Sequence, residues 1–321
     1  MVAIALLLLT ALLAFANGAN DVSKGIATLV GSGVTDYRRA VLWGSSCTVA
    51  GAIAAAFVSQ ALVATFSGKG VFAQPAISET FLLAIGCGAI GWLALATYSG
   101  LPVSTTHSLA GALVGAALMQ SGPRGVAWGA LLSKIALPLA ISPLMSMALL
   151  LVIVPLLQPA IERLGGICVC VESGGGASVT PDGIALRQPL PAIEVGSAAS
   201  CDTAAVRLRP TDVLHWISSG ATSFFRGLND APKILALGVA SGMALGISNL
   251  PLYVTVAVAM GVGSVVAGIR VTQTLAEKVT PITPVNGLVA NAVTSLLVGA
   301  ASRFALPVST THVSSGAIIG V

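Results

Sequence analysis

Charged residues are scarce in this chain of 321 residues. Asp, Glu, Lys and Arg together make up 8% of it, whereas about a quarter of the residues of an average soluble domain are charged. Hydrophobic residues make up 55%, and the mean hydropathy is +0.95. The basic residues behind the net charge of +4 are scattered, so we expect no binding of nucleic acid. This composition indicates a protein that crosses a membrane several times and is surrounded by lipid.

Cysteine is also rare. Cys47 and Cys87 lie within apolar runs, whereas Cys168, Cys170 and Cys201 lie in a polar central region. An odd number of cysteines without a C-x-x-C pair argues against both a disulfide framework and a zinc site. We therefore expect no bound cofactor.

Several apolar runs reach the length of about 20 residues that a membrane-spanning helix needs. The chain lacks the alternating ten-residue strands of an outer-membrane barrel, and backbone polar groups in lipid must be paired within their own segment. We therefore predict an all-α transmembrane protein of the plasma membrane, which in bacteria is the inner membrane. The runs are Val2–Ala16, Ala40–Val63, Phe81–Tyr98, Val126–Leu157, Leu250–Gly268 and Leu288–Ala301.

Two unlike motifs each occur twice, in the same order. FANGANDVSKGIATLVGSG starts at Phe15 and matches FFRGLNDAPKILALGVASG, which starts at Phe224, at an offset of 209 residues. LPVSTTHSLAGALVG starts at Leu101 and matches LPVSTTHVSSGAIIG, which starts at Leu306, at an offset of 205 residues. Such recurrence marks a duplicated unit.

The duplication divides the chain into three parts. Residues 1–157 form a first membrane repeat, residues 158–211 a polar linker that we place in the cytoplasm, and residues 212–321 a second membrane repeat. The first repeat continues past its LPVSTTH helix to Leu157 without a counterpart in the second, so we expect a C-terminal truncation. Polar residues and glycine between Asn17 and Asp21 are expected to interrupt the first helix in mid-membrane.

The two Ser-Thr-Thr runs have the chemistry of an oxyanion site. Hydroxyls at a helix start, together with unpaired backbone N–H groups and the positive end of the helix dipole, can converge on a tetrahedral anion. Ser and Thr in membrane helices often only bond to a neighbouring turn, but the duplication beside an Asn-Asp pair favours binding. The predicted substrate-binding residues are Asn20, Ser104, Thr105, Thr106, Asn229, Ser309, Thr310 and Thr311.

Two aspartates accompany these runs. A carboxylate in mid-membrane is costly and usually functional. An anion about 5 Å from a carboxylate is repelled by about 3 kcal/mol per charge pair at an effective dielectric of 20, so cations must enter with it. Asp21 and Asp230, helped by Asn20 and Asn229, are the predicted cation ligands. The sequence leaves open whether they bind Na⁺ or carry H⁺.

Two lysines and two histidines are expected to modulate the site. Lys24 and Lys233 lie three residues after the aspartates, on the same helix face, so each can pair with its carboxylate. We expect them to replace part of the cation requirement, unless they extend to an interface and only anchor the helix. His107 and His312 follow the hydroxyl runs and either contact the proton or anion or only orient the loop.

These motifs closely resemble the signatures of the inorganic phosphate transporter family, called PiT or PHO4. The resemblance covers nearly the whole chain. It implies a cation-coupled importer of phosphate, built from two inverted repeats whose discontinuous or re-entrant helices meet at a site in the middle of the membrane. It assigns substrate and cation binding to the Asn-Asp pairs and Ser-Thr-Thr runs. Most members have asparagine where this chain has Lys24, which bears on the number of coupled ions.

Other functions remain as alternatives. Some relatives of the family carry sulfate, so a sulfate or other oxyanion permease of the same fold is the first of these. A channel would need a lined pore. A hydrolase built from Ser104, His107 and Asp21 would need one such set and gain nothing from a second, so we do not expect an enzyme. The sequence leaves a homodimer open.

Overall fold

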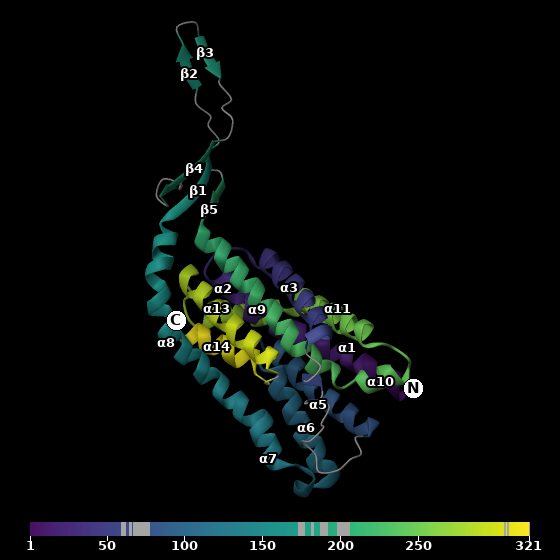
Figure 1. The fold of residues 1–321 in the computed structure, drawn as a ribbon. Coiled ribbons are helices and arrows are strands. Elements are labelled where there is room, and N and C mark those ends of the chain that lie inside the picture. The colour runs from purple at the N-terminus through teal and green to yellow at the C-terminus, as the bar shows by residue number, and fades with distance from the viewer. Residues whose placement is uncertain are drawn as a thin grey trace.

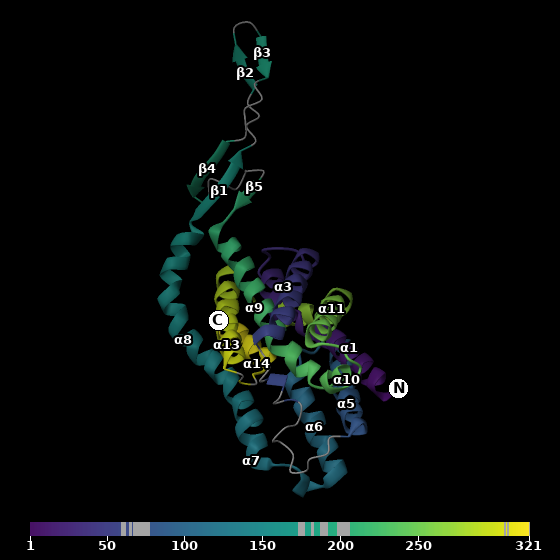
Figure 2. The ribbon, with the colours of Figure 1, turned by 45° about the vertical axis from the view of Figure 1, so that its right-hand side comes forward.

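The membrane part of the protein is a bundle of helices (Figures 1 and 2). The computed structural model describes residues 1–58, 62–63, 66, 78–172, 177–180, 183–186, 192–197, 206–304, 306 and 308–320. Within these ranges, six helical segments are long and apolar enough to cross a membrane, which confirms the predicted all-α transmembrane class. They are Val2–Gly31, Tyr37–Val58, Glu79–Tyr98, Trp128–Gly165, Asn249–Ala267 and Pro284–Arg303.

Each repeat contributes a similar series of helices. The first comprises α1 (Val2–Asp21), α2 (Ser23–Gly31), α3 (Tyr37–Val58), α5 (Glu79–Tyr98) and α6 (Thr105–Ser121), followed by η1 (Pro123–Gly125), α7 (Trp128–Leu131), η2 (Leu132–Ala136) and α8 (Leu137–Gly165). The second comprises α9 (Pro210–Leu235), α10 (Val239–Ala244), α11 (Asn249–Ala267), α12 (Ile269–Gln273), η3 (Thr274–Lys278), α13 (Pro284–Arg303) and α14 (Thr310–Gly320).

Equivalent helices of the two repeats begin with equivalent caps. Ser78 caps α5 by accepting a hydrogen bond from the Phe81 N–H, and Thr283 caps α13 through the N–H three residues later. Ser104 and Ser309 accept the His107 and His312 N–H groups at 3.2 and 3.1 Å. A hydroxyl acceptor satisfies one of the N–H groups that a helix start leaves unpaired. The Ser-Thr-Thr runs therefore do stand at helix starts.

The expected interruption between Asn17 and Asp21 is wrong. These residues belong to α1, and the only break is at Val22, whose backbone keeps helical angles of φ −56° and ψ −33°. In the second repeat α9 likewise continues through Asn229 and Asp230. The helix does not have to unwind because the side chains of Asn17 and Asp21 find buried partners. Non-helical backbone instead precedes α6 and α14, directly before the Ser-Thr-Thr runs.

Two pairs of helices cross closely at equivalent glycines. α1 packs on α11, where a Cβ at Gly18 would overlap the Met260 carbonyl, and α9 packs on α3, where a Cβ at Gly227 would overlap the Thr48 carbonyl. Small residues allow this approach inside a membrane. Figures 1 and 2 show α1 and α9 running in opposite directions through the middle of the bundle.

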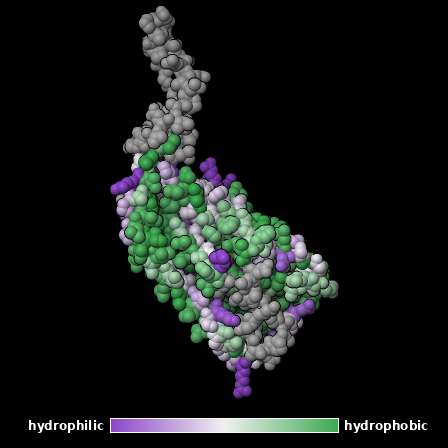
Figure 3. All heavy atoms as spheres, viewed as in Figure 1, coloured by the Kyte–Doolittle hydropathy of each residue, from purple (hydrophilic) through white to green (hydrophobic). Residues whose placement is uncertain are grey.

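Helix α8 is the last helix of the first repeat but packs on the second. It lies along α13 and α14 (Figure 1), and Leu150 and Ile161 share a hydrophobic cluster with Val289 and Ala317. Large hydrophobic residues of α8, such as Leu144, Leu151 and Leu156, are exposed. In Figure 3, hydrophobic residues gather along the side of the molecule where α8 lies. Such a surface suits lipid.

The central segment contains strands that the sequence patterns do not predict. β1 (Ile167–Glu172) pairs antiparallel with β4 (Ala192–Ser197) and β5 (Val206–Leu208), and β2 (Ala177–Thr180) pairs with β3 (Gly183–Leu186). The strands extend beyond one end of the helical part (Figure 1). The neighbouring helices also enter the expected linker, since α8 ends at Gly165 and α9 begins at Pro210.

Candidate functional site

The two Asn-Asp motifs bring their charged residues together in the interior of the bundle. Asp21 and Lys24 are fully buried, and Asp230 and Lys233 are each 1% exposed. Each lysine forms an ion pair with the aspartate three residues before it, as their spacing on a helix predicts. We call these four residues, with Asn17 and Arg226, the central polar cluster. Paired carboxylates and ammonium groups explain how such charges persist in the membrane.

Lys24 is surrounded by oxygen atoms. Besides the Asp21 carboxylate, its ammonium donates to Asn20 Oδ1 at 3.0 Å and to the Val103 carbonyl at 3.0 Å. Val103 lies directly before the first Ser-Thr-Thr run. The helix start of α6 is therefore tied to the first Asn-Asp motif through one lysine.

Lys233 has the equivalent surroundings in the second repeat. It donates to Asp230 Oδ1 at 3.1 Å, to the Val308 carbonyl at 3.0 Å and to Asn229 Oδ1. It also donates to Thr106 Oγ1 of the first repeat at 2.8 Å. Carboxylate, amide and carbonyl oxygens are the ligands that hard cations take. In this conformation the oxygens proposed for Na⁺ are held by ammonium groups.

Asn17 connects the two aspartates. Its Nδ2 donates to Asp21 Oδ2 at 2.9 Å and to Asp230 Oδ2 at 3.3 Å, and also to Thr105 Oγ1 at 2.9 Å. Its Oδ1 accepts from Arg226 Nη1 at 3.3 Å. Arg226 occupies the position in the second repeat that Asn17 occupies in the first, at the same offset of 209 residues. The two repeats thus meet at equivalent residues.

The hydroxyls of the Ser-Thr-Thr runs lie beside this cluster and are largely engaged. Thr105 Oγ1 donates to Asp21 Oδ2 at 3.2 Å. Thr106 and Thr311 donate to valine carbonyls of the opposite repeat, while Ser104 and Ser309 cap their helices. Thr310 is 4% exposed. An anion that binds here has to take over some of these hydrogen bonds.

The two predicted asparagines bind different parts of the two repeats. Asn20 Nδ2 donates to Thr97 Oγ1 at 3.1 Å and to the Leu101 carbonyl at 3.0 Å, and Asn20 Oδ1 accepts from the Val103 N–H at 3.0 Å. In the second repeat Asn229 Nδ2 donates to Ser302 Oγ at 3.0 Å. The Asn20 amide therefore fixes the entry to the first hydroxyl run, whereas the Asn229 amide binds the last turn of α13.

His107 and His312 face each other. Their ring centroids lie 4.5 Å apart with an angle of 60° between the ring planes. His107 Nδ1 lies 2.9 Å from Ser104 Oγ. The starts of α6 and α14, one from each repeat, are therefore in contact at the rings that follow the hydroxyl runs.

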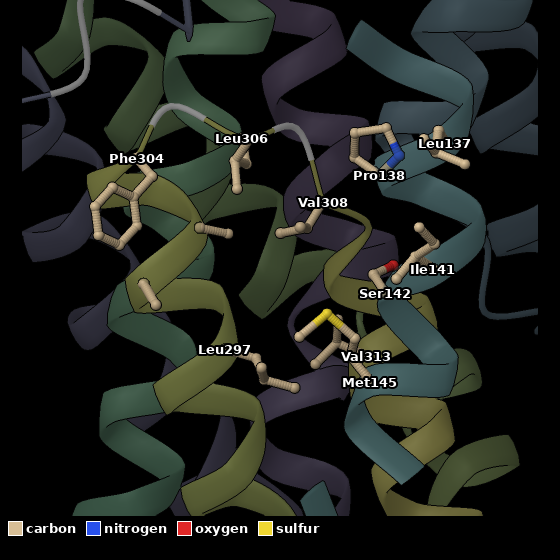
Figure 4. A pocket seen from close by; sticks show the side chains of 12 residues that line it. Leu137, Pro138, Ile141, Ser142, Met145, Leu297, Phe304, Leu306, Val308 and Val313 are labelled. Atoms are coloured by element: carbon tan, nitrogen blue, oxygen red, sulfur yellow. The ribbon is translucent and has the colours of Figure 1, made fainter. Parts of the chain in front are cut away.

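A separate pocket of about 310 Å³ lies between α8, α13 and the chain before α14 (Figure 4). Ser142 is the one polar side chain among its lining residues, and Val308, directly before the second hydroxyl run, also lines it. A pocket without charge or convergent donors does not suit an oxyanion.

Sequence patterns missed several polar residues of the interior. Arg226 is 1% exposed, and its Nη2 donates to Thr48 Oγ1 at 2.6 Å. His215 lies buried in α9, with its Nε2 3.0 Å from Thr28 Oγ1. Asn291 of α13 donates to the same Thr28 of α2 at 2.7 Å and so joins the two helices. For Arg226, the one sequence signal of a special role is that it aligns with Asn17, a different residue type, when the two repeats are compared.

A polytopic helical bundle with a buried polar centre built from two repeats is the architecture of a secondary transporter. The chain belongs to the Phosphate transporter family, whose model matches residues 17–321. It is an integral membrane protein, and its fold and relatives are those of transporters rather than enzymes.

Its relatives include proteins named "Probable low-affinity inorganic phosphate transporter". That of Mycobacterium leprae is 28% identical, with 95% of this chain and 65% of the relative covered. That of Rhizobium meliloti is also 28% identical, with 96% and 81% covered. The chain thus spans slightly less than two thirds of the mycobacterial protein.

A solved structure titled "The sodium-dependent phosphate transporter" matches with a TM-score of 0.73 at 21% identity, over 99% of this chain and 88% of the other. At this identity the match establishes the shared fold.

Proposed function

We propose that this protein imports inorganic phosphate as a secondary transporter, together with a coupling cation. The observation that carries the proposal is the meeting of two Asn-Asp motifs and two Ser-Thr-Thr helix starts, one of each per repeat, in one buried centre. Hydroxyls and helix N-termini bind oxyanions, and discontinuous segments aimed at a central site are common in secondary transporters. The names of the relatives support phosphate as the substrate.

In this proposal the residues have distinct parts. Ser104, Thr105, Thr106 and their counterparts Ser309, Thr310 and Thr311 contact the anion. Asp21 and Asp230 bind the coupling cation if it is Na⁺, or carry the proton if it is H⁺. Asn20 and Asn229 contribute oxygens and donors to the cation and anion sites, and Lys24, Lys233, His107 and His312 modulate binding.

We also propose that the two repeats are inverted in the membrane, with residues 158–211 as a cytoplasmic linker between them. The opposite directions of α1 and α9 and the reciprocal contacts at equivalent residues support this arrangement (Figure 1). Inversion lets two copies of one motif approach a central site from opposite sides.

The test is uptake of labelled phosphate by the full chain in proteoliposomes, under an inward gradient of Na⁺ or H⁺ and with sulfate as competitor. We expect saturable phosphate uptake that the Ser104→Ala, Thr105→Ala, Ser309→Ala, Thr310→Ala variant loses. Ser133→Ala with Thr255→Ala is the control, since these hydroxyls are exposed and each donates to the backbone carbonyl four residues earlier in the chain.

Three results would contradict the proposal. Absence of uptake under every gradient would remove the transport function. Full uptake by the fourfold variant would remove the proposed site. Transport of sulfate with exclusion of phosphate would keep the site and replace the substrate.

A further inference from the structure

Arg226 and Asn17 are the one pair of equivalent positions in the central polar cluster at which the two repeats carry different residues. Asp21, Lys24 and Asn20 all recur in the second repeat, but the position of Asn17 is filled there by Arg226. The arginine is 1% exposed and is among the largest fully buried side chains of the described chain. The interior therefore carries a charge in one repeat that the other repeat lacks.

The hydrogen-bond partners of this guanidinium are neutral. Nη1 donates to Asn17 Oδ1 at 3.3 Å and Nη2 to Thr48 Oγ1 at 2.6 Å. Nε is buried and has no hydrogen-bond partner among the described residues. A guanidinium offers five N–H donors in a planar fork, so donors remain available after these two contacts.

The nearby carboxylates are already engaged. Asp21 and Asp230 form their ion pairs with Lys24 and Lys233. With both aspartates ionised, the cluster contains two carboxylates and three cations, and thus one positive charge in excess. A buried positive charge that the neighbouring carboxylates do not fully balance is costly and, inside a membrane, usually marks a functional site.

We propose that Arg226 is a direct ligand of the transported oxyanion. This inference rests on the proposed function and adds a binding residue to it. The guanidinium fork fits two oxygens of a tetrahedral anion, and charge-assisted bonds of this kind are stronger than those from hydroxyls. Asn17 touches both Arg226 and Thr105 Oγ1, so the free donors lie one side chain away from the first Ser-Thr-Thr run.

A purely structural role of Arg226 can be distinguished from anion binding by measuring the affinity for the anion. An arginine that only ties α9 to Thr48 would affect folding and turnover, whereas a ligand sets the affinity for the anion. Arg226→Gln removes the charge and keeps a polar side chain. Arg226→Lys keeps the charge and loses the fork.

The experiment measures the dissociation constant of the purified full chain for inorganic phosphate, and separately for sulfate, by titration calorimetry. We expect Arg226→Gln to weaken anion binding by roughly 10- to 100-fold, because a hydrogen bond to a charged group contributes on the order of 1.5–3 kcal/mol. Arg226→Lys should lie between this variant and the wild type. Arg270→Gln is the matched control, since Arg270 is exposed and bonds to the Tyr98 carbonyl, and it should bind as the wild type does.

Each outcome of this experiment supports or overturns Arg226 as a ligand of the anion. A folded Arg226→Gln protein with an unchanged dissociation constant overturns the proposal. If that variant does not fold, a folded Arg226→Lys protein decides in the same way, with weaker binding in support and unchanged binding against. A wild type that binds sulfate but not phosphate contradicts the proposed substrate while the arginine is tested on sulfate. A wild type that binds neither anion overturns both.

Discussion

Thr106 and Thr311, equivalent residues of the two repeats, make the same hydrogen bond in opposite directions. Thr106 Oγ1 donates to the Val308 carbonyl at 3.3 Å, and Thr311 Oγ1 donates to the Val103 carbonyl at 2.8 Å. Each carbonyl also accepts from the lysine of its own repeat. The two helix starts are thereby held against each other above the charged centre. A carrier that alternates between two sides has to separate such a contact.

Removing these hydroxyls should therefore loosen the closed centre. We expect Thr106→Val and Thr311→Val each to lower the apparent melting temperature by a few degrees, since one buried hydrogen bond contributes about 1 kcal/mol. The two effects should not add, because both bonds belong to one network. Thermal unfolding of the purified protein measures this.

Thr255→Val is the control for the two threonines. Its hydroxyl is exposed and bonds to the Pro251 carbonyl of its own helix, so its loss should leave the melting temperature unchanged. Wild-type melting of both buried variants would show that the reciprocal bonds do not hold the repeats together.

Much of the helical framework could be predicted because it depends on local properties. A membrane span is a long apolar run, so the predicted Phe81–Tyr98 run differs from α5 by two residues at its start. The cap of this helix is local as well, since the Ser78 hydroxyl directly before the apolar run accepts the Phe81 N–H. The paired lysines follow from a spacing of three residues.

The remaining features depend on contacts between distant parts of the chain. Asn17 stays helical because Asp230, 213 residues away, accepts from its side chain, and no local pattern contains that distance. The partners of Arg226 come from α1 and α3. A repeat alignment flags Arg226 as different but cannot say that it is buried.

The inversion of the repeats predicts where two loops lie. Asp36 precedes α3 and Ser248 precedes α11, and both are exposed. In a background with all five cysteines replaced by serine, we expect Asp36→Cys and Ser248→Cys to react with a membrane-impermeant maleimide from opposite sides. The neighbouring Arg38 and Arg39 favour the cytoplasmic side for Asp36.

Intact cells and inside-out vesicles, labelled in parallel, distinguish the two faces. Permeabilised membranes provide the control, because both cysteines should then react equally. Reaction of both from the same face in sealed membranes would exclude inversion of the repeats.

The last prediction is that the ammonium groups of Lys24 and Lys233 take the place of coupled cations. The two lysines are 0% and 1% exposed, so neither reaches the interface as an anchor would. Each ammonium is held by a carboxylate, an amide oxygen and a carbonyl, which is a set of ligands that Na⁺ also accepts. A fixed positive charge at this place offsets the repulsion between the aspartates and an incoming anion.

Neutral replacements should therefore create a demand for cations. We expect Lys24→Asn, and more strongly Lys24→Asn with Lys233→Asn, to need more Na⁺ or H⁺ for phosphate uptake and to show a steeper dependence on its concentration. At low cation concentration the double variant should be slower than the wild type by about tenfold or more, which corresponds to about 1.4 kcal/mol. Lys278→Asn, at an exposed position, is the control and should retain the wild-type curve.

The shape of the curve separates this role from simple damage. A variant that is only destabilised loses uptake by the same factor at every cation concentration, whereas a variant that has lost a built-in cation recovers as Na⁺ or H⁺ rises, because the ion can occupy the vacated oxygens. Uptake should therefore be measured from zero to saturating cation at fixed phosphate. If transport stays intact and its cation dependence is unchanged, Lys24 and Lys233 do not replace coupled ions, and their pairing with the aspartates only stabilises the fold.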